Sequence, residues 1–292
     1  MKTLLLLTLM ITTSSCSQDF GQLQIITSMP NDRVEISGIE KMHGNPYLWM
    51  IEDAGNNATV YTYNIQSKKM GPEYPITRAK NKDWEDITSD QNGNLYIGDF
   101  GNNEGKRKDL KIYKLSGIAS AKSNDSITSI IEFKLEDQTK FPPKKKNLNV
   151  DIEGFFYHKN FLYLFTRNRS KNFDGTTKMY KLPATPGKHK AKLVGTYKTC
   201  KDHNDCQITA AAINEKSKTV ALLSYNKVWI IRDYKKDNFL DGDITEIKLG
   251  HSSQKESVTF KDKNTLYIAD ERSGPDGGNL YELDIKKALK HK

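Results

Sequence analysis

Cysteine is scarce in this sequence, and no apolar run is long enough to cross a membrane. The 292 residues include 3 cysteines and 9 prolines. The longest apolar stretch, Leu4–Ile11, is much shorter than the roughly 20 residues that a transmembrane helix needs. The motifs Gly-x-Ser-x-Gly, the P-loop and His-Glu-x-x-His do not occur. The hydrolase, nucleotide-binding and zinc-peptidase chemistries that depend on these motifs therefore lose support.

The N-terminus has the pattern of an export signal. A basic residue precedes the apolar run, and the small residues at positions 13–15 lead directly into Cys16. This arrangement resembles a bacterial lipobox, which predicts a lipoprotein signal peptide over residues 1–15, lipidation of Cys16 and a tether over residues 16–21. The alternative is an ordinary secretory signal in which the cysteine has no role. We expect an exported outer-membrane lipoprotein, periplasmic or on the cell surface, that touches the bilayer only through its lipid.

The two other cysteines are predicted to form a disulfide. Cys200 and Cys206 are separated by a short polar segment, and an even number of cysteines in an exported protein favours a bridge. The bridge would hold a surface turn rather than the core. A metal site built on both thiols needs more soft ligands than the nearby His203 supplies.

The formal net charge of +9 comes mainly from scattered lysines. Clusters such as residues 144–146 and 188–190 lie in polar stretches, with no basic helix and no aromatic RNA-binding signature beside them. We therefore expect solvated loops, with some attraction to anionic surfaces, rather than nucleic-acid binding. The expected protein is a monomer whose partner is a small anionic ligand or a surface partner of unknown identity.

One β pattern recurs along the chain. Residues 83–103 contain an acidic cluster, alternating residues, a polar turn, an apolar run and a Gly-rich exit. This order predicts a hairpin of two antiparallel strands, Trp84–Ser89 and Leu95–Asp99. Repeats at intervals of roughly fifty residues indicate stacking of one β unit around an axis. Related stretches cover residues 36–57, 151–168, 256–274 and, less clearly, 207–226.

The repeats predict an all-β fold with a single domain over residues 22–292. We expect a five-bladed β-propeller, with six blades as the alternative, in which each blade is a four-stranded antiparallel sheet. The last repeat has no outer strand before the sequence ends, whereas Leu23–Thr27 is strand-like and has no partner. The N-terminal strand is therefore expected to complete the last blade, because closing the ring removes exposed edges.

The starts of the inner strands are the predicted metal site. In a propeller the start of each inner strand lies near the axis, on the same face as the end of the second strand. Carboxylates gathered there must protonate, be solvated or share a cation. Oxygen ligands of this kind suit Ca²⁺, and the absence of His and Cys disfavours zinc. The alternative is that the acids cap strands or pair with Lys and Arg. The residues at these starts are Ser37, Glu85, Glu153, Thr209 and Glu256.

The ends of the second strands are expected to form a polar ring around the cation. Arginines in this ring are suited to clamp an anionic ligand through paired hydrogen bonds. The alternative is that the Asn and Gly residues simply form tight turns. The predicted ligand-binding residues are Asp53, Asn57, Asp99, Asn103, Arg167, Arg169 and Arg272.

With these residues in place, the chain resembles the exported bacterial propellers of the SdiA-regulated-like and phytase-esterase-like groups. More distantly it is similar to the five-bladed calcium-activated nucleotidase (apyrase) fold. That resemblance implies an axial calcium bound by a mixture of Ser and Glu at the blade starts. In this chain Ser37, Glu85, Glu153, Thr209 and Glu256 occupy the matching places.

Three functions follow from these patterns. The favoured hypothesis is a membrane-anchored lipoprotein whose calcium-binding propeller holds an unidentified ligand or partner. The alternative is a calcium-dependent hydrolase of phosphate esters, anhydrides or lactones, in which the metal polarises the substrate or a water. Its candidate catalytic residues are Asp99, Asp270 and Glu271. A propeller that only serves as a scaffold is the third possibility, because the fold alone does not choose between functions.

Overall fold

The computed structural model describes residues 18–118, 127–274 and 276–290. The predicted signal peptide and the lipidation site Cys16 lie outside the described residues. In the part of the chain that is described, no helix is both long and apolar enough to cross a membrane.

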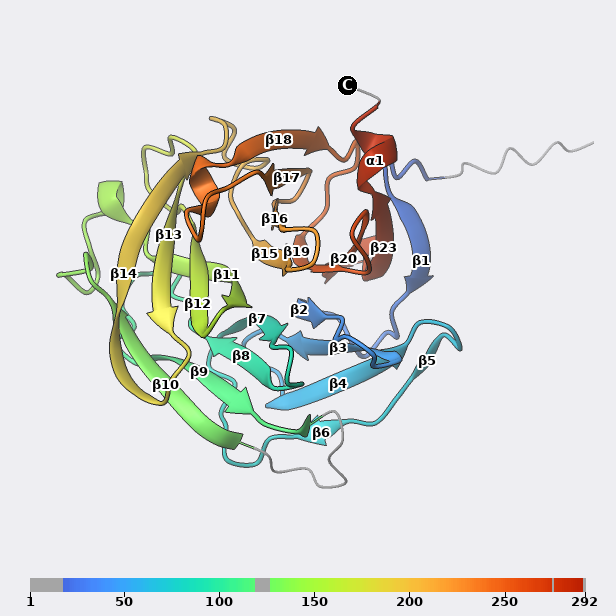
Figure 1. Ribbon diagram of the computed structural model, residues 1–292, viewed down its shortest axis with the longest axis horizontal. Helices are drawn as coiled ribbons and strands as arrows, with labels where there is room; N and C mark the ends of the chain where they lie inside the picture. Colours follow the sequence, from blue (N-terminus) through green and yellow to red (C-terminus); the bar gives the residue numbers. More distant parts are fainter. Residues whose placement is uncertain (1–17, 119–126, 275, 291–292) are drawn as a thin grey trace, which may run out of the picture.

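The described residues form five groups of antiparallel strands arranged around a central axis (Figure 1). In each group the chain begins with the inner strand and proceeds outwards, except that the outermost strand of the last group is β1, the first strand of the chain. The groups are β2 (Ile36–Glu40), β3 (Tyr47–Glu52), β4 (Thr59–Asn64), β5 (Lys69–Met70) and β6 (Tyr74–Pro75); β7 (Trp84–Ser89), β8 (Leu95–Asp99), β9 (Leu110–Leu115) and β10 (Ile127–Leu135); β11 (Asp151–His158), β12 (Phe161–Arg167), β13 (Thr176–Pro183) and β14 (Gly187–Lys198); β15 (Ala210–Asn214), β16 (Thr219–Leu223), β17 (Lys227–Arg232) and β18 (Asp243–Lys248); and β19 (Lys255–Phe260), β20 (Thr265–Asp270), β23 (Asn279–Asp284) and β1 (Gln24–Ser28).

The smaller elements lie outside these groups. β21 (Arg272–Ser273) and β22 (Asp276–Gly277) form a short ribbon, and the chain ends with helix α1 (Ile285–Ala288). The 3₁₀ turns η2 (Lys145–Asn147) and η3 (Phe239–Asp241) belong to loops. β10 also pairs in parallel with β14, which joins the second and third groups into one eight-stranded sheet.

The N-terminal strand closes the ring, as the sequence predicts. β1 pairs antiparallel with β23, so the first strand of the chain is the outermost strand of the last group. The inner strands contact one another in the cyclic order β2, β7, β11, β15, β19 and back to β2. Each inner strand is the end strand of its sheet, and closure places its unpaired edge beside the neighbouring inner strands rather than in open solvent.

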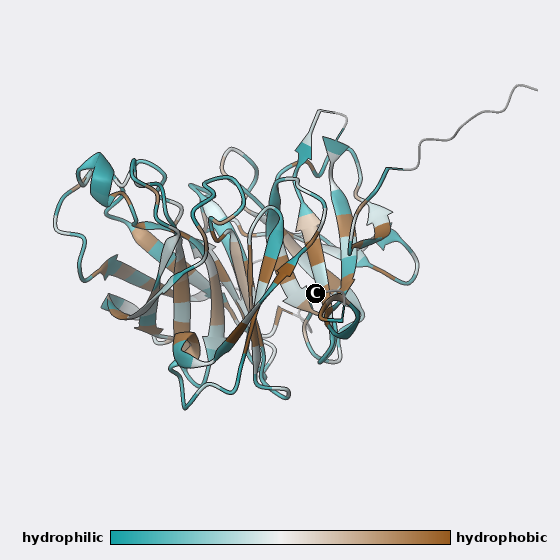
Figure 2. Cartoon of the chain, turned by 90° about the horizontal axis from the view of Figure 1, so that it is seen from above, coloured by the Kyte–Doolittle hydropathy of each residue, from teal (hydrophilic) through white to brown (hydrophobic). Residues whose placement is uncertain are grey.

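Apolar side chains fill the spaces between neighbouring sheets. Inner and middle strands such as β8 and β16 are buried throughout, whereas the outer strand β14 alternates towards solvent. Hydrophobic segments accordingly follow the strands, and the loops are mostly hydrophilic (Figure 2). Trp49 and Trp84 belong to the apolar cluster between the first two sheets. Each of the five clusters joins two adjacent sheets.

Small residues allow the inner strands to approach closely. A Cβ added at Gly154 would lie 2.6 Å from the Ala210 carbonyl carbon, and one at Gly38 would lie 2.9 Å from the Ile87 nitrogen. Both positions therefore require glycine because a neighbouring backbone occupies the space of a side chain.

The predicted disulfide is present. Cys200 and Cys206 are bridged, with their Cα atoms 5.5 Å apart. Residues 201–204 of the enclosed loop are exposed, in agreement with a surface turn. Cys206 itself is buried and belongs to the apolar cluster between the third and fourth sheets. The bridge thus connects an exposed turn to the core, which the short polar loop alone did not indicate.

Candidate functional site: an acidic cluster at one end of the axis

The predicted metal-binding residues occupy equivalent backbone positions. In β2, β7, β11 and β19 the pairing register shifts by one residue near the start of the strand. The unpaired residue at each shift is a β-bulge, which turns a side chain out of the regular alternation. These bulge residues are Ser37, Glu85, Glu153 and Glu256. The fifth residue, Thr209, directly precedes β15 and donates its backbone N–H to the Leu223 carbonyl.

The two hydroxyl residues hold adjacent sheets together. The Ser37 hydroxyl donates to the Trp84 carbonyl at 2.7 Å, and the Thr209 hydroxyl donates to the Lys255 carbonyl at 2.6 Å. Both side chains are fully buried. In this structure their hydrogen bonds connect each inner strand to the start of another.

An arginine lies between two of the three predicted glutamates. Nη1 of Arg167 is 3.2 Å from Glu153 Oε2 and 3.1 Å from Glu256 Oε1. Nη2 of Arg167 also donates to the Tyr225 hydroxyl at 2.8 Å. The guanidinium group is therefore an internal cation that neutralises carboxylates from two separate blade starts.

A second arginine extends this network. Nε of Arg169 is 2.6 Å from Asp151 Oδ2, and its Nη2 is 2.8 Å from Glu153 Oε1. Burial opposes ionisation of Glu153, but Arg167 and Arg169 outweigh it and hold the pKa of that carboxyl below its usual value. Asp151 is fully buried and accepts the Asn102 N–H at 2.6 Å, yet burial and Glu153 raise its pKa. Arg167 and Arg169 are thus engaged with protein carboxylates rather than free for a ligand.

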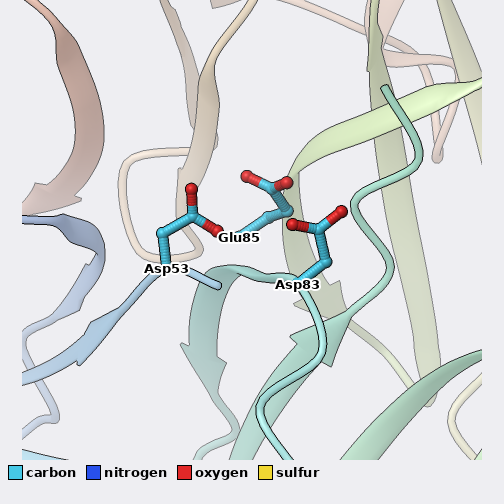
Figure 3. A group of neighbouring side chains, drawn as sticks. All are labelled: Asp53, Asp83 and Glu85. Atoms are coloured by element: carbon cyan, nitrogen blue, oxygen red, sulfur yellow. The ribbon is translucent and has the colours of Figure 1, made fainter. Parts of the chain in front are cut away.

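Three further carboxylates meet without such neutralisation (Figure 3). Asp53, Asp83 and Glu85 each offer an oxygen, and these oxygens lie within 4.8 Å of one another. Asp53 follows β3, Asp83 precedes β7, and Glu85 is the bulge residue of β7. Among the described residues, none of the three has an ion-pair partner, and only Asp53 accepts a hydrogen bond, from the Ala54 N–H. Glu85 also lies within the same distance of Asp151 and Glu153.

The electrostatics of this trio reflect its crowding. Burial and the neighbouring carboxylates raise the pKa of Asp53 to about 7 and that of Asp83 to about 6, although Arg107 and Arg169 oppose the shift at Asp83. The pKa of Glu85, which is only 6 % exposed, is raised well above its ordinary value for the same reasons. Without a cation, the cluster reduces repulsion by binding protons. A bound cation would let all three carboxylates ionise.

Gly101 makes room for the trio. A Cβ on Gly101 would lie 2.0 Å from Glu85 Oε1 and 2.5 Å from Asp83 Oδ2. The glycine in Asp99-Phe-Gly-Asn-Asn is therefore needed for close approach of the two acids. The equivalent Gly55 has a φ of 88° and open space around it, so there the tight-turn interpretation is the better one.

The remaining predicted ring residues have varied roles. Asp99 is fully buried and paired with Arg107 at 2.8 Å. Asp270 accepts the Asn279 N–H at 2.7 Å and the Tyr281 hydroxyl at 2.8 Å. These two aspartates support the loops of their own sheets. Of the others, Asn103 accepts from Arg169 at 2.8 Å, Arg272 donates to the Met29 carbonyl at 2.8 Å, and the Asn57 side chain is exposed.

Glu271 differs from these residues. Burial and the adjacent Glu256 raise its pKa to about 10, and its Oε2 accepts a hydrogen bond from Gln254 at 3.0 Å. Glu271 therefore retains its proton at neutral pH and can act as a hydrogen-bond or proton donor.

Sequence reasoning did not identify Asp83 and Asp151 as members of the site. Each of these aspartates stands two residues before a bulge glutamate, Asp83 before Glu85 and Asp151 before Glu153. This Asp-x-Glu spacing was the available signal. This spacing places two carboxylates of one segment near the axis, at the start of an inner strand.

Comparison with known proteins gives the fold and no family. No protein-family model matches the chain, and no curated protein matches it. Glutaminyl cyclase of Myxococcus xanthus is similar in structure, with a TM-score of 0.53 and 12 % identity over 89 % of this chain and 94 % of that one. The chain is a β-propeller.

Other solved structures are similar to this propeller at lower scores. PQQ-bound aldose sugar dehydrogenase of Streptomyces coelicolor has a TM-score of 0.48 and 11 % identity, over 90 % of this chain and 98 % of that one. A chain of a nidogen/laminin complex has a TM-score of 0.47 and 13 % identity, over 82 % and 73 %. Sequence identities this low carry no information on activity.

The raised pKa of Asp83 predicts that this residue destabilises the folded protein more at high pH than at low pH. A carboxyl whose folded pKa exceeds its unfolded value of about 4 makes the folded state less stable as pH rises through that interval. In EDTA, Asp83→Asn is therefore expected to raise the thermal midpoint at pH 8 by about 2 °C or more, solvent screening included, and to leave it unchanged at pH 4. The measurement is thermal unfolding at both pH values, with the exposed Asp202→Asn as control. An equal change at both pH values would contradict the assignment.

Proposed function

We propose that this propeller binds a divalent cation, with Ca²⁺ as the expected ion, at the end of its axis where Asp53, Asp83 and Glu85 meet. The observation that carries the proposal is the close approach of three carboxylates, none of which has an ion-pair partner among the described residues. Carboxylate oxygens are the ligands that Ca²⁺ prefers, and its loose geometry tolerates donors from separate loops. The set differs from the one expected from the sequence, because Glu85 alone is common to both.

The bound cation would connect the first two sheets. Asp53 belongs to the first sheet, whereas Asp83 and Glu85 belong to the second, so one ion would hold both at the axis. Its remaining positions would face the loops at this end of the ring and could hold the oxygens of an anionic ligand. The predicted small anionic ligand would then lie beside the cation and would be bound mainly by the metal, because Arg167 and Arg169 already hold carboxylates.

The experiment is calcium titration of the protein after treatment with EDTA. Calorimetry should detect binding, and calcium at 100 times its Kd should stabilise the fold by about 2.7 kcal/mol. Glu85→Gln should abolish both effects yet fold at least as stably in EDTA, because it removes a buried acid that has no ion-pair or hydrogen-bond partner in the described part of the chain. Asp202→Asn is the matched control and should bind as the wild type does. Absence of heat and of any change in the melting temperature with millimolar calcium would refute the proposal.

We further propose that the protein is an exported lipoprotein whose propeller has five blades. The count of five blades is supported by the five groups of strands and the five apolar clusters between them. Lipidation of Cys16, attachment to the outer membrane and a monomeric state rest on the sequence alone. In this setting the axial site would face the periplasm or the exterior, where calcium is available to an exported protein.

A calcium-dependent hydrolase of phosphate esters, anhydrides or lactones is the second candidate, and Glu271 favours it. A carboxyl with a pKa of about 10 can protonate a leaving group, so Glu271 would be a general acid rather than a base. Asp99 and Asp270 are less suited, because both are committed to hydrogen bonds inside their sheets. Turnover of p-nitrophenyl phosphate or a simple lactone that requires calcium and is lost in Glu271→Gln would favour the enzyme over the binding protein.

A further inference from the structure

A polar cavity lies close to the axial site and has no part in the proposed cation binding. It has a volume of about 740 Å³, within the range of small-molecule sites. The loop between β10 and β11 forms one wall, and the loop between β12 and β13 forms the other. Asn168, which directly follows Arg167, lines the cavity. The cavity therefore begins next to the axial network and extends outwards between the two loops.

The cavity carries an excess of positive charge. Lys140, Lys144 and Lys146 line it, their side chains are exposed, and none has a carboxylate partner among the residues that the structure describes. The two acids of the lining are already neutralised. Asp137 lies 2.5 Å from Lys178 Nζ, and Asp174 lies 3.2 Å from Lys198 Nζ. These three lysines are thus available for an anionic ligand, and they are separate from the buried acids at the axis.

The lining contains one buried amide side chain and several accessible polar ones. Gln138 is 7 % exposed, and its Nε2 donates to the Gly105 carbonyl at 2.9 Å. Its Oε1 is buried without a hydrogen-bond partner in the described part of the chain. A buried amide oxygen left unpaired is costly, but this oxygen has almost no accessible surface, so the accessible amides of the lining would supply the hydrogen bonds to a ligand. Further amide and hydroxyl groups line the same space, among them Asn147 and Asn172.

The chemistry of the lining excludes ligands that depend on stacking. None of the described residues around the cavity is aromatic, whereas nucleobases are usually held on aromatic rings. Affinity must therefore come from charge and from hydrogen bonds. A ligand with several anionic groups and many hydroxyls fits both requirements.

The walls are held in place by backbone hydrogen bonds. Arg169 N–H donates to the Leu148 carbonyl at 2.9 Å, and Lys171 N–H donates to the Lys145 carbonyl at 3.0 Å. These bonds join the two loops beneath the cavity. A binding site formed in advance avoids the entropic cost of ordering loops when the ligand arrives.

We propose that this cavity binds an acidic oligosaccharide, with the sulfate or carboxylate groups of the sugar at Lys140, Lys144 and Lys146 and its hydroxyls on the amide groups of the lining. Sulfated sugars and uronic acids share this chemistry. The proposal is independent of the cation site, so binding is measured in EDTA and in the Glu85→Gln variant, where it should be unchanged.

The experiment compares two double variants that remove equal charge. A heparin hexasaccharide and a galacturonate hexasaccharide are titrated into the protein, with a neutral dextran oligosaccharide as the third arm. Lys144→Gln with Lys146→Gln should weaken binding of the preferred acidic sugar by about tenfold or more, as loss of charge-assisted hydrogen bonds predicts. Lys188→Gln with Lys190→Gln, on the outer strand β14, should change it less than about twofold, as expected for distant surface charges that salt screens.

Four outcomes would contradict the proposal, and the first would show only a general attraction to a basic protein. Equal losses in both double variants would overturn it, because the net charge of +9 alone would then explain binding. No binding of either acidic sugar, or equal binding of dextran, would also overturn it. Asn172→Ala, which keeps every charge, should weaken binding by about threefold, as loss of one neutral hydrogen bond predicts. An unchanged affinity in this variant would contradict hydrogen bonding within the cavity. The preference between the two acidic sugars then identifies sulfate or carboxylate as the anionic group.

Discussion

Replacing Arg167 by methionine is expected to lower the free energy of unfolding by about 3–5 kcal/mol at neutral pH, the usual cost of removing one partner from a buried ion pair. Arg167 contacts Glu153 and Glu256, which come from different blade starts. Methionine preserves much of the apolar length of the side chain but leaves both carboxylates without this cation. The loss should therefore come from uncompensated charge rather than from a cavity.

The pH dependence of this loss distinguishes charge from packing. In the wild type the pKa of Glu153 is below its usual value because Arg167 and Arg169 outweigh the effect of burial. Its contribution to stability is therefore present above the unfolded pKa of about 4.3 and is lost as pH falls through the lower folded pKa. Without Arg167 the folded pKa should rise, so protonation should relieve the variant. The deficit of Arg167→Met should shrink markedly between pH 7 and pH 4.

Chemical unfolding at these two pH values tests the prediction. Arg232→Met is a matched control, because Arg232 has no carboxylate partner among the residues described and lies far along the chain on β17. It should cost less than about 1 kcal/mol, as for most surface substitutions. Adding Glu153→Gln to Arg167→Met should restore part of the stability at pH 7. The charge explanation fails if the deficit is equal at both pH values and Glu153→Gln restores nothing.

Replacing Asp86 by alanine is expected to cost a similar amount, for a different reason. Asp86 is 1 % exposed and follows the bulge residue of β7. Its Oδ1 accepts the Ile87 N–H at 2.8 Å, and its Oδ2 accepts the Phe155 N–H of β11 at 2.9 Å. Burial raises its pKa well above the ordinary value, although these backbone bonds oppose that shift. The side chain therefore joins two inner strands near the centre of the ring.

Alanine at position 86 would leave the Phe155 N–H buried without an acceptor and would open a cavity between the inner strands. The two effects together predict a loss of about 3–5 kcal/mol. Asp86→Asn retains one acceptor oxygen and should lose distinctly less. Urea unfolding of both variants is the measurement, and the exposed Asp202→Ala serves as control. A loss below about 1 kcal/mol for Asp86→Ala would mean that water or a shifted backbone satisfies the inner strands.

Local patterns in the sequence predicted the strands well. Residues 83–103 predicted strands at Trp84–Ser89 and Leu95–Asp99, and β7 and β8 have these bounds. The unpartnered segment at Leu23–Thr27 corresponds closely to β1, which closes the ring on β23. These predictions succeeded because alternation, turn residues and the need to pair every strand edge act over short stretches or as simple counts.

The backbone positions of the site were also predictable, but the partners of its side chains were not. Spacing within each repeat located the bulge residues Glu85, Glu153 and Glu256. It did not indicate that Arg167 neutralises the last two or that Asp53 joins Asp83 and Glu85. Arg167 and Asp53 were predicted as ligand-binding residues of the polar ring, and Asp83 lies in the acidic cluster of residues 83–103. Their contacts with the glutamates were not predicted.

The sequence alone therefore determined a closed ring of β-sheets with acids at the starts of its inner strands. The three-dimensional structure was needed to show which acids are paired with arginines and which meet without an ion-pair partner among the described residues. The physical reason is that the energy of a carboxylate depends on burial and on charges a few ångströms away, and here those charges come from segments as distant as Arg167 and Glu256. Such distances are set by how whole sheets pack around the axis.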